Sequence, residues 1–462
     1  MLMRLPIAGN GAVRFVHIWS VMLLCLVATP SPAADRLLWP GPTNNVSAEI
    51  SSTRIVPILR KIAAATGWKV FVEPGSDHAV TVKFKNLPPG EALRLLLGDL
   101  NFALVPSSNA PARLFVFKTS RGNATEFVPP AKLSEAAKAK LIGNELIVRL
   151  KPGSNIDDLA RLVGAKVVGR IDDLNAYRLR FENDTAANLS RDLLSSNPEV
   201  SDVDSNYMLE RPEVPQNVTS STPPPQLQLR PPPDSGKIII GLVDTSVQSL
   251  GELDKFVLKS ISVAGTPSSG PTEPTHGTTM VGTILRALQA ETKGVTSVQI
   301  LPVDVYGPNP TTSTFDVAAG IILARNNGAT IINLSLGSET ESSFLRDTVT
   351  EVSKTDVALF AAKGNQPTTT PFFPAALEGV TAVTATEQGH LAPYANLADI
   401  PTVGAPGRSV VSFNGLNFLS TGTSVASANV SGIAAGFMDA NSKGVSDAKA
   451  YILNNMSIVR PK

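Results

Sequence analysis

The C-terminal half of the chain alternates apolar runs of strand length with segments of helical pattern. The strand candidates are residues 238–243, 299–305, 330–334, 357–362 and 380–385, and the helix candidates are residues 276–287, 315–326, 344–353, 424–440 and 445–455. Continuous apolar strands separated by helices predict a parallel sheet that is covered on both faces. We therefore expect a doubly wound α/β domain over residues 237–462, with its site beyond the carboxyl ends of the strands.

The size and charge of the chain exclude some classes of function. Its 462 residues are enough for about three domains. The 40 Lys and Arg residues almost balance the 39 Asp and Glu residues, so there is no overall positive field of the kind that supports nucleic-acid binding. We expect no nucleic-acid partner.

The N-terminus has the pattern of an export signal. Arg4 and Arg14 precede the apolar run 18–28, which contains the sole cysteine, Cys25, and small residues follow up to Ala34. The run is too short for a membrane span, which needs roughly 20 apolar residues. We expect residues 1–34 to be a signal peptide and the mature protein to be exported, to the periplasm or outside the cell, without stable membrane insertion.

Two small α+β units and a linker are predicted between the signal and the C-terminal domain. Residues 35–120 combine amphipathic helices with short strands, and residues 137–210 have the order β-α-β-β-α-β of ferredoxin-like domains. Residues 211–236 are rich in proline, as in Pro223-Pro224-Pro225, and such a segment cannot form a core. We expect it to be an exposed linker.

Candidate catalytic residues stand in the C-terminal half. Asp244 directly follows the strand 238–243, which puts its carboxylate at the carboxyl edge of the sheet. Of the four histidines, His276 opens a predicted helix in this domain, whereas His390 follows a Gln-Gly turn. Ser424 precedes a run of small residues that is a poor helix by propensity. Close packing of a buried helix and presentation of a nucleophile at a helix N-terminus are both open for this run.

In chain order, Asp244, His276 in Thr275-His276-Gly277-Thr278, and Ser424 in Gly422-Thr423-Ser424-Val425-Ala426 resemble the subtilisin-like serine proteases, a family known for the order Asp, His, Ser. The resemblance implies a serine endopeptidase with an Asp244-His276-Ser424 triad that needs no metal or organic cofactor. It also implies that Asn365 donates to the oxyanion. The same resemblance assigns substrate binding to Ser335, Leu336, Gly337, Ala362 and Gly364.

The two small units also resemble known domains. Residues 137–210 are similar to a subtilisin propeptide, notably in the runs 164–168 and 197–207, which implies a zymogen whose own propeptide occupies the cleft until it is cut. We expect self-cleavage in or near residues 206–236. Residues 35–120 resemble the short N-terminal domain of secretins and TonB-dependent receptors, notably in the runs 66–70 and 89–93. That resemblance implies a protein-interaction domain, and a generic α+β domain is the other interpretation.

Several departures from the family pattern keep a second hypothesis open. Ser246, Lys363 and the pair Ala428-Asn429 stand where the family usually has other residues, and residues 285–294 do not match its usual calcium-binding loop. Calcium binding is possible, but the sequence shows no metal site. The alternative to an enzyme acting on a protein or peptide substrate is a non-catalytic scaffold that docks on a secretin or TonB-type envelope complex. An esterase is disfavoured because no Gly-x-Ser-x-Gly elbow surrounds Ser424.

Overall fold

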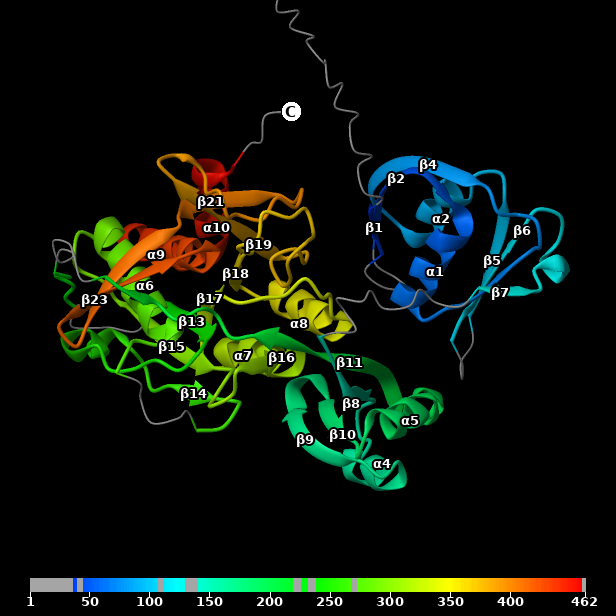
Figure 1. The fold of residues 1–462 in the computed structure, drawn as a ribbon, viewed down its shortest axis with the longest axis horizontal. Coiled ribbons are helices and arrows are strands. Elements are labelled where there is room, and N and C mark those ends of the chain that lie inside the picture. Colours follow the sequence, from blue (N-terminus) through cyan, green and yellow to red (C-terminus); the bar gives the residue numbers. More distant parts are fainter. Residues whose placement is uncertain are drawn as a thin grey trace, which may run out of the picture.

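The computed structural model describes residues 36–39, 45–106, 111–128, 140–218, 226–231, 238–266 and 272–458. The predicted signal peptide lies outside the described residues. Figure 1 shows three units along the chain: a first small domain, a second small domain whose last strand runs towards the third, and a large C-terminal domain.

The first domain has one antiparallel sheet, one mixed sheet and two helices. Its sheets have the orders β1-β2-β4 and β5-β6-β3-β7. Its elements are β1 (Arg36–Leu38), β2 (Val46–Arg54), α1 (Ile55–Thr66), β3 (Lys69–Val72), β4 (Ala79–Leu87), α2 (Pro89–Leu97), β5 (Asn101–Val105), β6 (Arg113–Phe117) and β7 (Glu126–Val128). Helix α1 buries Ile55, Ile58, Leu59 and Ile62 on one face and ends at Gly67, whose φ is 69°.

The boundary of the first domain differs from the predicted one. The sequence predicts an end at residue 120, but β7 lies beyond that point and pairs antiparallel with β3. Val128 is buried in the core of this domain. The strand was missed because three residues carry too little periodicity for recognition, and only the pairing with β3 makes it a strand.

The second domain is a four-stranded antiparallel sheet with two helices. Its order along the chain is β-α-β-β-α-β, and its strand order is β11-β8-β10-β9. Its elements are β8 (Leu141–Leu150), α4 (Ile156–Leu162), β9 (Lys166–Ile171), β10 (Ala176–Arg180), α5 (Asp184–Ser196) and β11 (Val200–Glu210). Asn155 and Asn183 begin the two helices, because each side chain accepts a hydrogen bond from a backbone N–H of the first turn.

The C-terminal domain is built on a mostly parallel sheet of order β14-β15-β13-β17-β18-β19-β20, with β21 also paired to β19. Its strands are β13 (Ile238–Asp244), β14 (Ile261–Ser262), β15 (Val298–Asp304), β16 (Thr311–Ser313), β17 (Ala329–Leu334), β18 (Ala358–Ala362), β19 (Val380–Glu387), β20 (His390–Leu391), β21 (Thr402–Pro406), β22 (Arg408–Phe413) and β23 (Leu416–Thr421). Its helices are α6 (His276–Thr292), α7 (Thr314–Asn326), α8 (Ser343–Ser353), α9 (Thr423–Asn441) and α10 (Val445–Met456).

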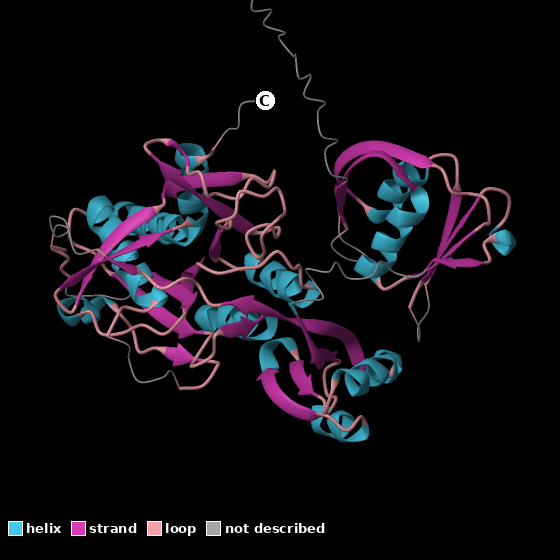
Figure 2. Cartoon of the chain, viewed as in Figure 1, coloured by secondary structure: helices cyan, strands magenta, loops and turns pink. Residues whose placement is uncertain are grey.

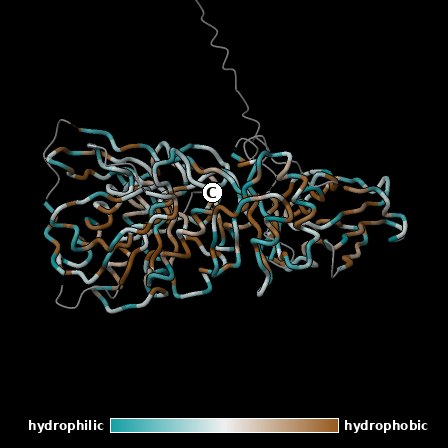
Figure 3. The backbone as a smooth tube through the Cα atoms, turned by 90° about the horizontal axis from the view of Figure 1, so that it is seen from below, coloured by the Kyte–Doolittle hydropathy of each residue, from teal (hydrophilic) through white to brown (hydrophobic). Residues whose placement is uncertain are grey.

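Helices cover both faces of this sheet (Figure 2). One hydrophobic cluster joins the strands to α7 and α8, and a second joins them to α6, α9 and α10. Strand β17 supplies both clusters, since Ile332 packs in the first and its neighbour Ile331 in the second. Figure 3 shows the most hydrophobic stretches of the backbone inside the domain and the hydrophilic ones at its rim. The predicted doubly wound α/β fold is confirmed.

Strand β11 joins the second domain to the C-terminal domain. Its earlier residues pair with β8, and its last three residues pair antiparallel with β16 of the C-terminal domain. Asn206, which is 0% exposed, accepts hydrogen bonds from Thr314 Oγ1 at 3.0 Å and from the Phe315 backbone N–H at 3.1 Å. Its amide Nδ2 donates to Glu145 at 2.7 Å. The Asn206 side chain therefore accepts from a backbone N–H at the N-terminus of α7 that has no partner within the helix.

Charged groups surround this junction. Arg178 pairs with Asp316 at 2.9 Å, and Arg149 pairs with Asp347 at 2.6 Å, so both ion pairs cross from the second domain to helices α7 and α8. Asp204 lies 3.8 Å from Arg149 Nη2 and accepts a hydrogen bond from Ser343 at the start of α8. Burial, and then the negative charge of Asp202 beside it, raise the pKa of Asp204 well above its ordinary value.

This shift predicts that docking of the second domain weakens as pH rises. A raised pKa means that the docked state favours protonated Asp204, so its contribution is complete below the ordinary Asp pKa of about 4 and is lost as pH rises through the raised pKa. Replacing Asp204 with Asn removes the titration. We expect Asp204→Asn to raise the melting temperature at pH 7–8 by about 2–4 °C, as roughly 1 kcal/mol would, and to change it little near pH 4.

Differential scanning calorimetry across this pH range tests the prediction. Every chain should also carry Ser424→Ala, so that the predicted self-cleavage cannot alter the sample. The matched control is Asp158→Asn, because Asp158 is an exposed carboxylate of the same domain that pairs with Arg161. A melting temperature for Asp204→Asn that equals or falls below the parent value at pH 7–8 contradicts the prediction.

Candidate active site

Asp244 and His276 form a buried pair at the carboxyl edge of the sheet. Asp244 ends β13 and is 0% exposed, and His276 begins α6 and is 8% exposed. The His276 Nδ1 atom lies 2.8 Å and 2.9 Å from the two carboxylate oxygens of Asp244. Since a carboxylate only accepts, Nδ1 carries a proton, and in the neutral imidazole Nε2 is then an acceptor.

The backbone around this pair fixes its geometry. The Thr245 N–H donates to Asp244 Oδ1 at 2.6 Å, and the Gly277 N–H donates to Thr245 Oγ1 at 2.8 Å. Thr275 caps α6 by accepting from the Thr278 N–H at 3.2 Å. A Cβ on Gly277 would lie 2.3 Å from the Thr245 carbonyl oxygen. The glycine after the histidine is therefore required by the close approach of α6 to the end of β13.

Ser424 lies in the first turn of α9. Its hydroxyl donates to the Ser335 carbonyl oxygen at 3.1 Å, and the Ser335 hydroxyl donates back to the Ser424 carbonyl at 2.9 Å. Because a serine hydroxyl has one proton, Ser424 does not donate to His276 in this arrangement. The structure brings the three predicted triad residues to one place, with the serine turned towards the strand end and not towards the histidine.

Asn365 is held with its amide nitrogen turned away from its anchoring contacts. Its Oδ1 accepts from the Thr423 backbone N–H at 2.8 Å and from Thr423 Oγ1 at 2.9 Å. Thr423 Oγ1 in turn accepts from the Gly364 N–H at 3.0 Å. A Cβ on Gly422, whose φ is +147°, would lie 2.7 Å from Asn365 Nδ2. Thr423 is a positioning residue that the sequence analysis did not single out, although it stands inside the Gly-Thr-Ser motif.

These residues line one cleft of about 460 Å³. Its walls include all the predicted site residues apart from Asp244, which lies behind His276: His276, Ser335, Leu336, Gly337, Ala362, Gly364, Asn365 and Ser424. They come from the carboxyl ends of β17 and β18, from the segments that follow these strands, and from the N-termini of α6 and α9. The N-terminus of α9, with its partial positive charge, lies at the same cleft as His276 of the Asp244–His276 pair. This arrangement is suited to forming and stabilising an oxyanion.

A buried polar network explains the small residues of α9. Ser427 and Ser431, one turn apart, both donate to Asn333 Oδ1 of β17, at 2.9 Å and 3.1 Å. The amide Nδ2 of Asn333 donates to Ser335 Oγ at 2.8 Å. A Cβ on Gly432 would lie 2.7 Å from the Ile284 carbonyl of α6. Close packing and presentation of Ser424 are thus both properties of this helix, and the serines four residues apart were the available signal for the network.

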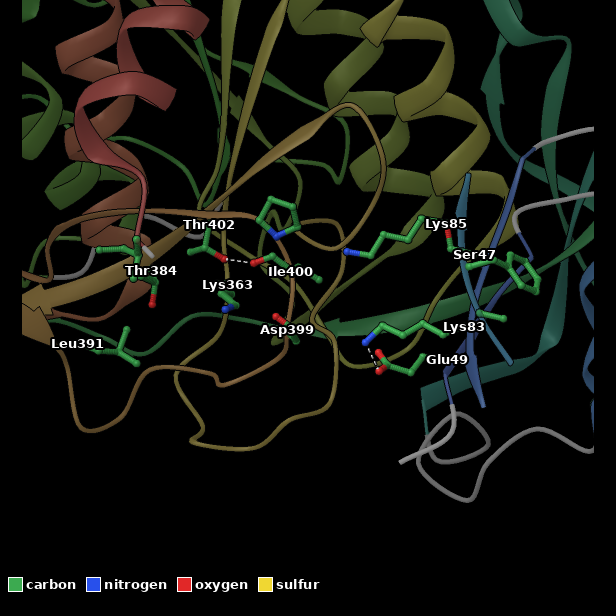
Figure 4. A pocket seen from close by; sticks show the side chains of 14 residues that line it. Ser47, Glu49, Lys83, Lys85, Lys363, Thr384, Leu391, Asp399, Ile400 and Thr402 are labelled. Atoms are coloured by element: carbon green, nitrogen blue, oxygen red, sulfur yellow. Dashed lines mark hydrogen bonds and ion pairs between the residues drawn. The ribbon is translucent and has the colours of Figure 1, made fainter. Parts of the chain in front are cut away.

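The side chain of Lys363, one of the departures from the family pattern, lies neither in the cleft nor in solvent. Ala362 and Gly364 line the cleft, whereas Lys363 between them is 2% exposed and lines a separate pocket with Thr384 and Asp399 (Figure 4). Successive residues of an extended segment point to opposite sides, so a lysine between two cleft residues must point away from the cleft. Figure 4 also shows Lys83 and Lys85 of the first domain at this pocket.

The segment predicted as an exposed linker is partly bound to the C-terminal domain. Residues 210–216 line the same cleft as His276 and Ser424. Strand β12 (Gln216–Asn217) pairs antiparallel with β23, and the Arg230 N–H donates to the Gly294 carbonyl at 2.9 Å. The composition correctly excluded a core of its own, but backbone pairing to a neighbouring strand needs no apolar pattern.

Two further departures from the family pattern, Ala428 and Asn429, lie in helix α9. The Asn429 amide donates to the Pro406 carbonyl at 2.9 Å, and Ala428 is buried.

Within the described ranges, no three or more His, Cys, Asp or Glu side chains are grouped in a way that could hold a metal ion. None of the helices in the described part of the chain has the length and hydropathy needed to cross a bilayer.

Family models match both the C-terminal domain and the second domain. The subtilase family model matches residues 235–459, and the model of the fervidolysin N-terminal prodomain matches residues 128–205. Among solved structures, fervidolysin from Fervidobacterium pennivorans, a keratinolytic enzyme related to subtilisin, has a TM-score of 0.51 at 20% identity, covering 66% of this chain and 56% of that one. At this level of identity the likeness concerns the fold.

Curated relatives match the C-terminal domain in sequence. The thermophilic serine proteinase of Bacillus sp. strain AK1 is 33% identical over 208 residues, which are 42% of this chain, and the match spans 51% of that protein. Subtilisin Savinase of Lederbergia lenta is 31% identical over 209 residues, which are 42% of this chain and 74% of Savinase. The chain thus spans about half the length of the first relative and most of the second. On this evidence the chain belongs to the subtilase family.

Proposed function

We propose that the chain is a serine endopeptidase that hydrolyses peptide bonds in proteins through an acyl-enzyme at Ser424. The observation that supports this most is the buried Asp244–His276 pair, with Nδ1 to carboxylate distances of 2.8 Å and 2.9 Å, at a cleft that also holds Ser424 and Asn365. A histidine with Nδ1 bonded to a buried carboxylate presents Nε2 as a base to a nucleophile in the cleft.

The reaction begins when the Ser424 hydroxyl turns from the Ser335 carbonyl to His276 Nε2. His276 takes the hydroxyl proton while Oγ forms a bond to the substrate carbonyl carbon, and Asp244 stabilises the resulting imidazolium. The amide Nδ2 of Asn365 and the Ser424 backbone N–H donate to the oxyanion. The C–N bond then breaks as His276 gives its proton to the leaving amine, and a water attacks the acyl-enzyme by the same steps.

The second domain and the segment behind it would keep the enzyme latent. Residues 210–216 line the cleft and remain joined to the second domain through β11, so the chain's own backbone competes with any substrate. The match to a prodomain model supports this role. We propose that activation is self-cleavage in or near residues 206–236. Export to the periplasm or beyond, and docking of the first domain on a secretin or TonB-type complex, stay predictions from sequence.

Labelling with a fluorophosphonate separates the protease from a non-catalytic scaffold. We expect the wild-type chain to form a covalent adduct at Ser424 and to lose its N-terminal part on incubation, and Ser424→Ala to do neither. Intact-mass analysis reports both events. Ser412→Ala, which changes an exposed serine of β22, should behave as the wild type. Equal clipping of the purified wild-type and Ser424→Ala chains rules out self-processing, and absence of an adduct favours the scaffold.

Asn365 and Thr423 should affect the rate of the chemical step more than substrate binding. Removing the oxyanion donor by Asn365→Ala is expected to lower kcat by about 10²–10³, the size of effect known for the corresponding change in subtilisin. Thr423→Val removes the hydroxyl that holds Asn365 and should lower kcat roughly tenfold, as loss of about 1.4 kcal/mol would.

Steady-state kinetics on a peptide substrate checks both variants. KM should change less than threefold in each, and Thr423→Ser, which keeps the hydroxyl, should restore most of kcat. A rise in KM with kcat unchanged would mean that Asn365 and Thr423 serve substrate binding only.

A further inference from the structure

One side chain of the segment in the cleft is bound in an unusual way. The guanidinium of Arg211 donates from Nη2 to the Gly307 carbonyl at 2.7 Å and from Nε to the Asn309 carbonyl at 3.0 Å. The Arg211 backbone N–H donates to the Pro310 carbonyl at 3.0 Å. A single turn behind β15 therefore binds both the backbone and the side chain of one residue.

The turn is built so that these carbonyls stay in place. Asp304, at the end of β15, accepts from the Tyr306 and Gly307 backbone N–H groups at 2.9 Å each. The Asn309 N–H donates to the Tyr306 carbonyl at 3.0 Å. Gly307 has φ +55°, and a Cβ there would lie 2.4 Å from the Ala264 carbonyl oxygen. The two acceptors for the guanidinium thus belong to a backbone fixed from inside the domain.

The surroundings of the turn favour a planar cation. The guanidinium carbon of Arg211 lies 5.2 Å from the centre of the Tyr306 ring, whose hydroxyl donates to the Glu210 carbonyl at 3.0 Å. Asp304 is 1% exposed, and its Oδ2 is without a hydrogen-bond partner among the described residues. Asp304 also stands opposite Asp244 on the neighbouring strand. The carboxyl group of Asp304, behind the turn, therefore interacts electrostatically with the Arg211 cation.

We propose that the 306–309 turn, with Asp304 behind it, is a subsite that selects an arginine side chain in the peptide substrate. The inference rests on the proposed function, because a substrate that follows the path of residues 210–216 past Ser424 would place a side chain on this turn. Two carbonyls set to receive Nε and Nη2 over a ring face match the rigid fork of arginine, whereas lysine offers one ammonium and no plane. Arg211 occupies the subsite in the uncleaved chain.

Hydrogen exchange measures occupancy of the subsite without any catalysis. In full-length chains that carry Ser424→Ala, we expect Arg211→Gln to speed exchange of the amides in residues 207–218 at least tenfold, and Arg211→Lys to have an intermediate effect. Glu213→Gln, which alters an exposed charge of the same segment, is the matched control and should leave exchange unchanged. Equal exchange with Arg and Gln at position 211 overturns the subsite.

Competition by synthetic peptides tests selection in the active enzyme. Three peptides copy residues 207–217 with Arg, Lys or citrulline at position 211, and citrulline keeps the shape of arginine without its charge. As competitive inhibitors of fluorescent casein hydrolysis, the Arg peptide should have a Ki about 10–100-fold below that of the citrulline peptide, as loss of charge-assisted hydrogen bonds implies.

The outcomes separate the two proposals. Equal Ki values with active enzyme overturn the arginine subsite and leave the protease standing. If casein is not hydrolysed and no fluorophosphonate adduct forms, the proposed function fails, and the exchange experiment alone then decides whether the turn binds arginine.

Discussion

A buried carboxylate is the constraint around which the C-terminal domain is arranged. Asp244 has no exposure to water, and an ionised group in that position is tolerated only when hydrogen bonds replace its hydration. His276 and the Thr245 N–H supply those bonds. Because His276 is also the first residue of α6, satisfying the carboxylate fixes where this helix begins and how it packs on the sheet. The pair that the proposed chemistry requires is thus the pair that positions the helix.

Helix α9 is likewise positioned by a buried polar group that needs hydrogen bonds. Asn333, 0% exposed in the middle of the sheet, is satisfied by two serines of α9 and by Ser335. Ser335 then exchanges hydrogen bonds with Ser424. A continuous chain of hydrogen bonds, buried at the sheet and partly buried at Ser424, therefore runs from the centre of the sheet to the proposed nucleophile. Such a network is costly when it is incomplete, so its full satisfaction holds Ser424 in register with the strand end.

The second domain is attached by a strand shared between two sheets. Strand β11 contributes its early residues to its own domain and its last residues to β16, so the docked arrangement continues a hydrogen-bonded ladder into the cleft. Arg211 follows directly and inserts its guanidinium at the turn behind β15. Latency and substrate selection, in this proposal, use the same backbone path, and the buried Asp204 contacts Ser343 where the two domains meet.

The sequence alone determined the α/β fold of the C-terminal domain and the order of five of its strands and its five helices, because apolar strands and helical periodicity are local patterns. Local pattern placed Asp244 at a strand end and His276 and Ser424 at helix starts, and the resemblance to the family motifs added Asn365. The structure places all four at one cleft. Tertiary structure decided the rest. Four features depend on residues that are distant in the sequence: strand β7, the burial of Lys363, the Asn333 network and the arginine-binding turn. Local sequence patterns do not identify such distant partners.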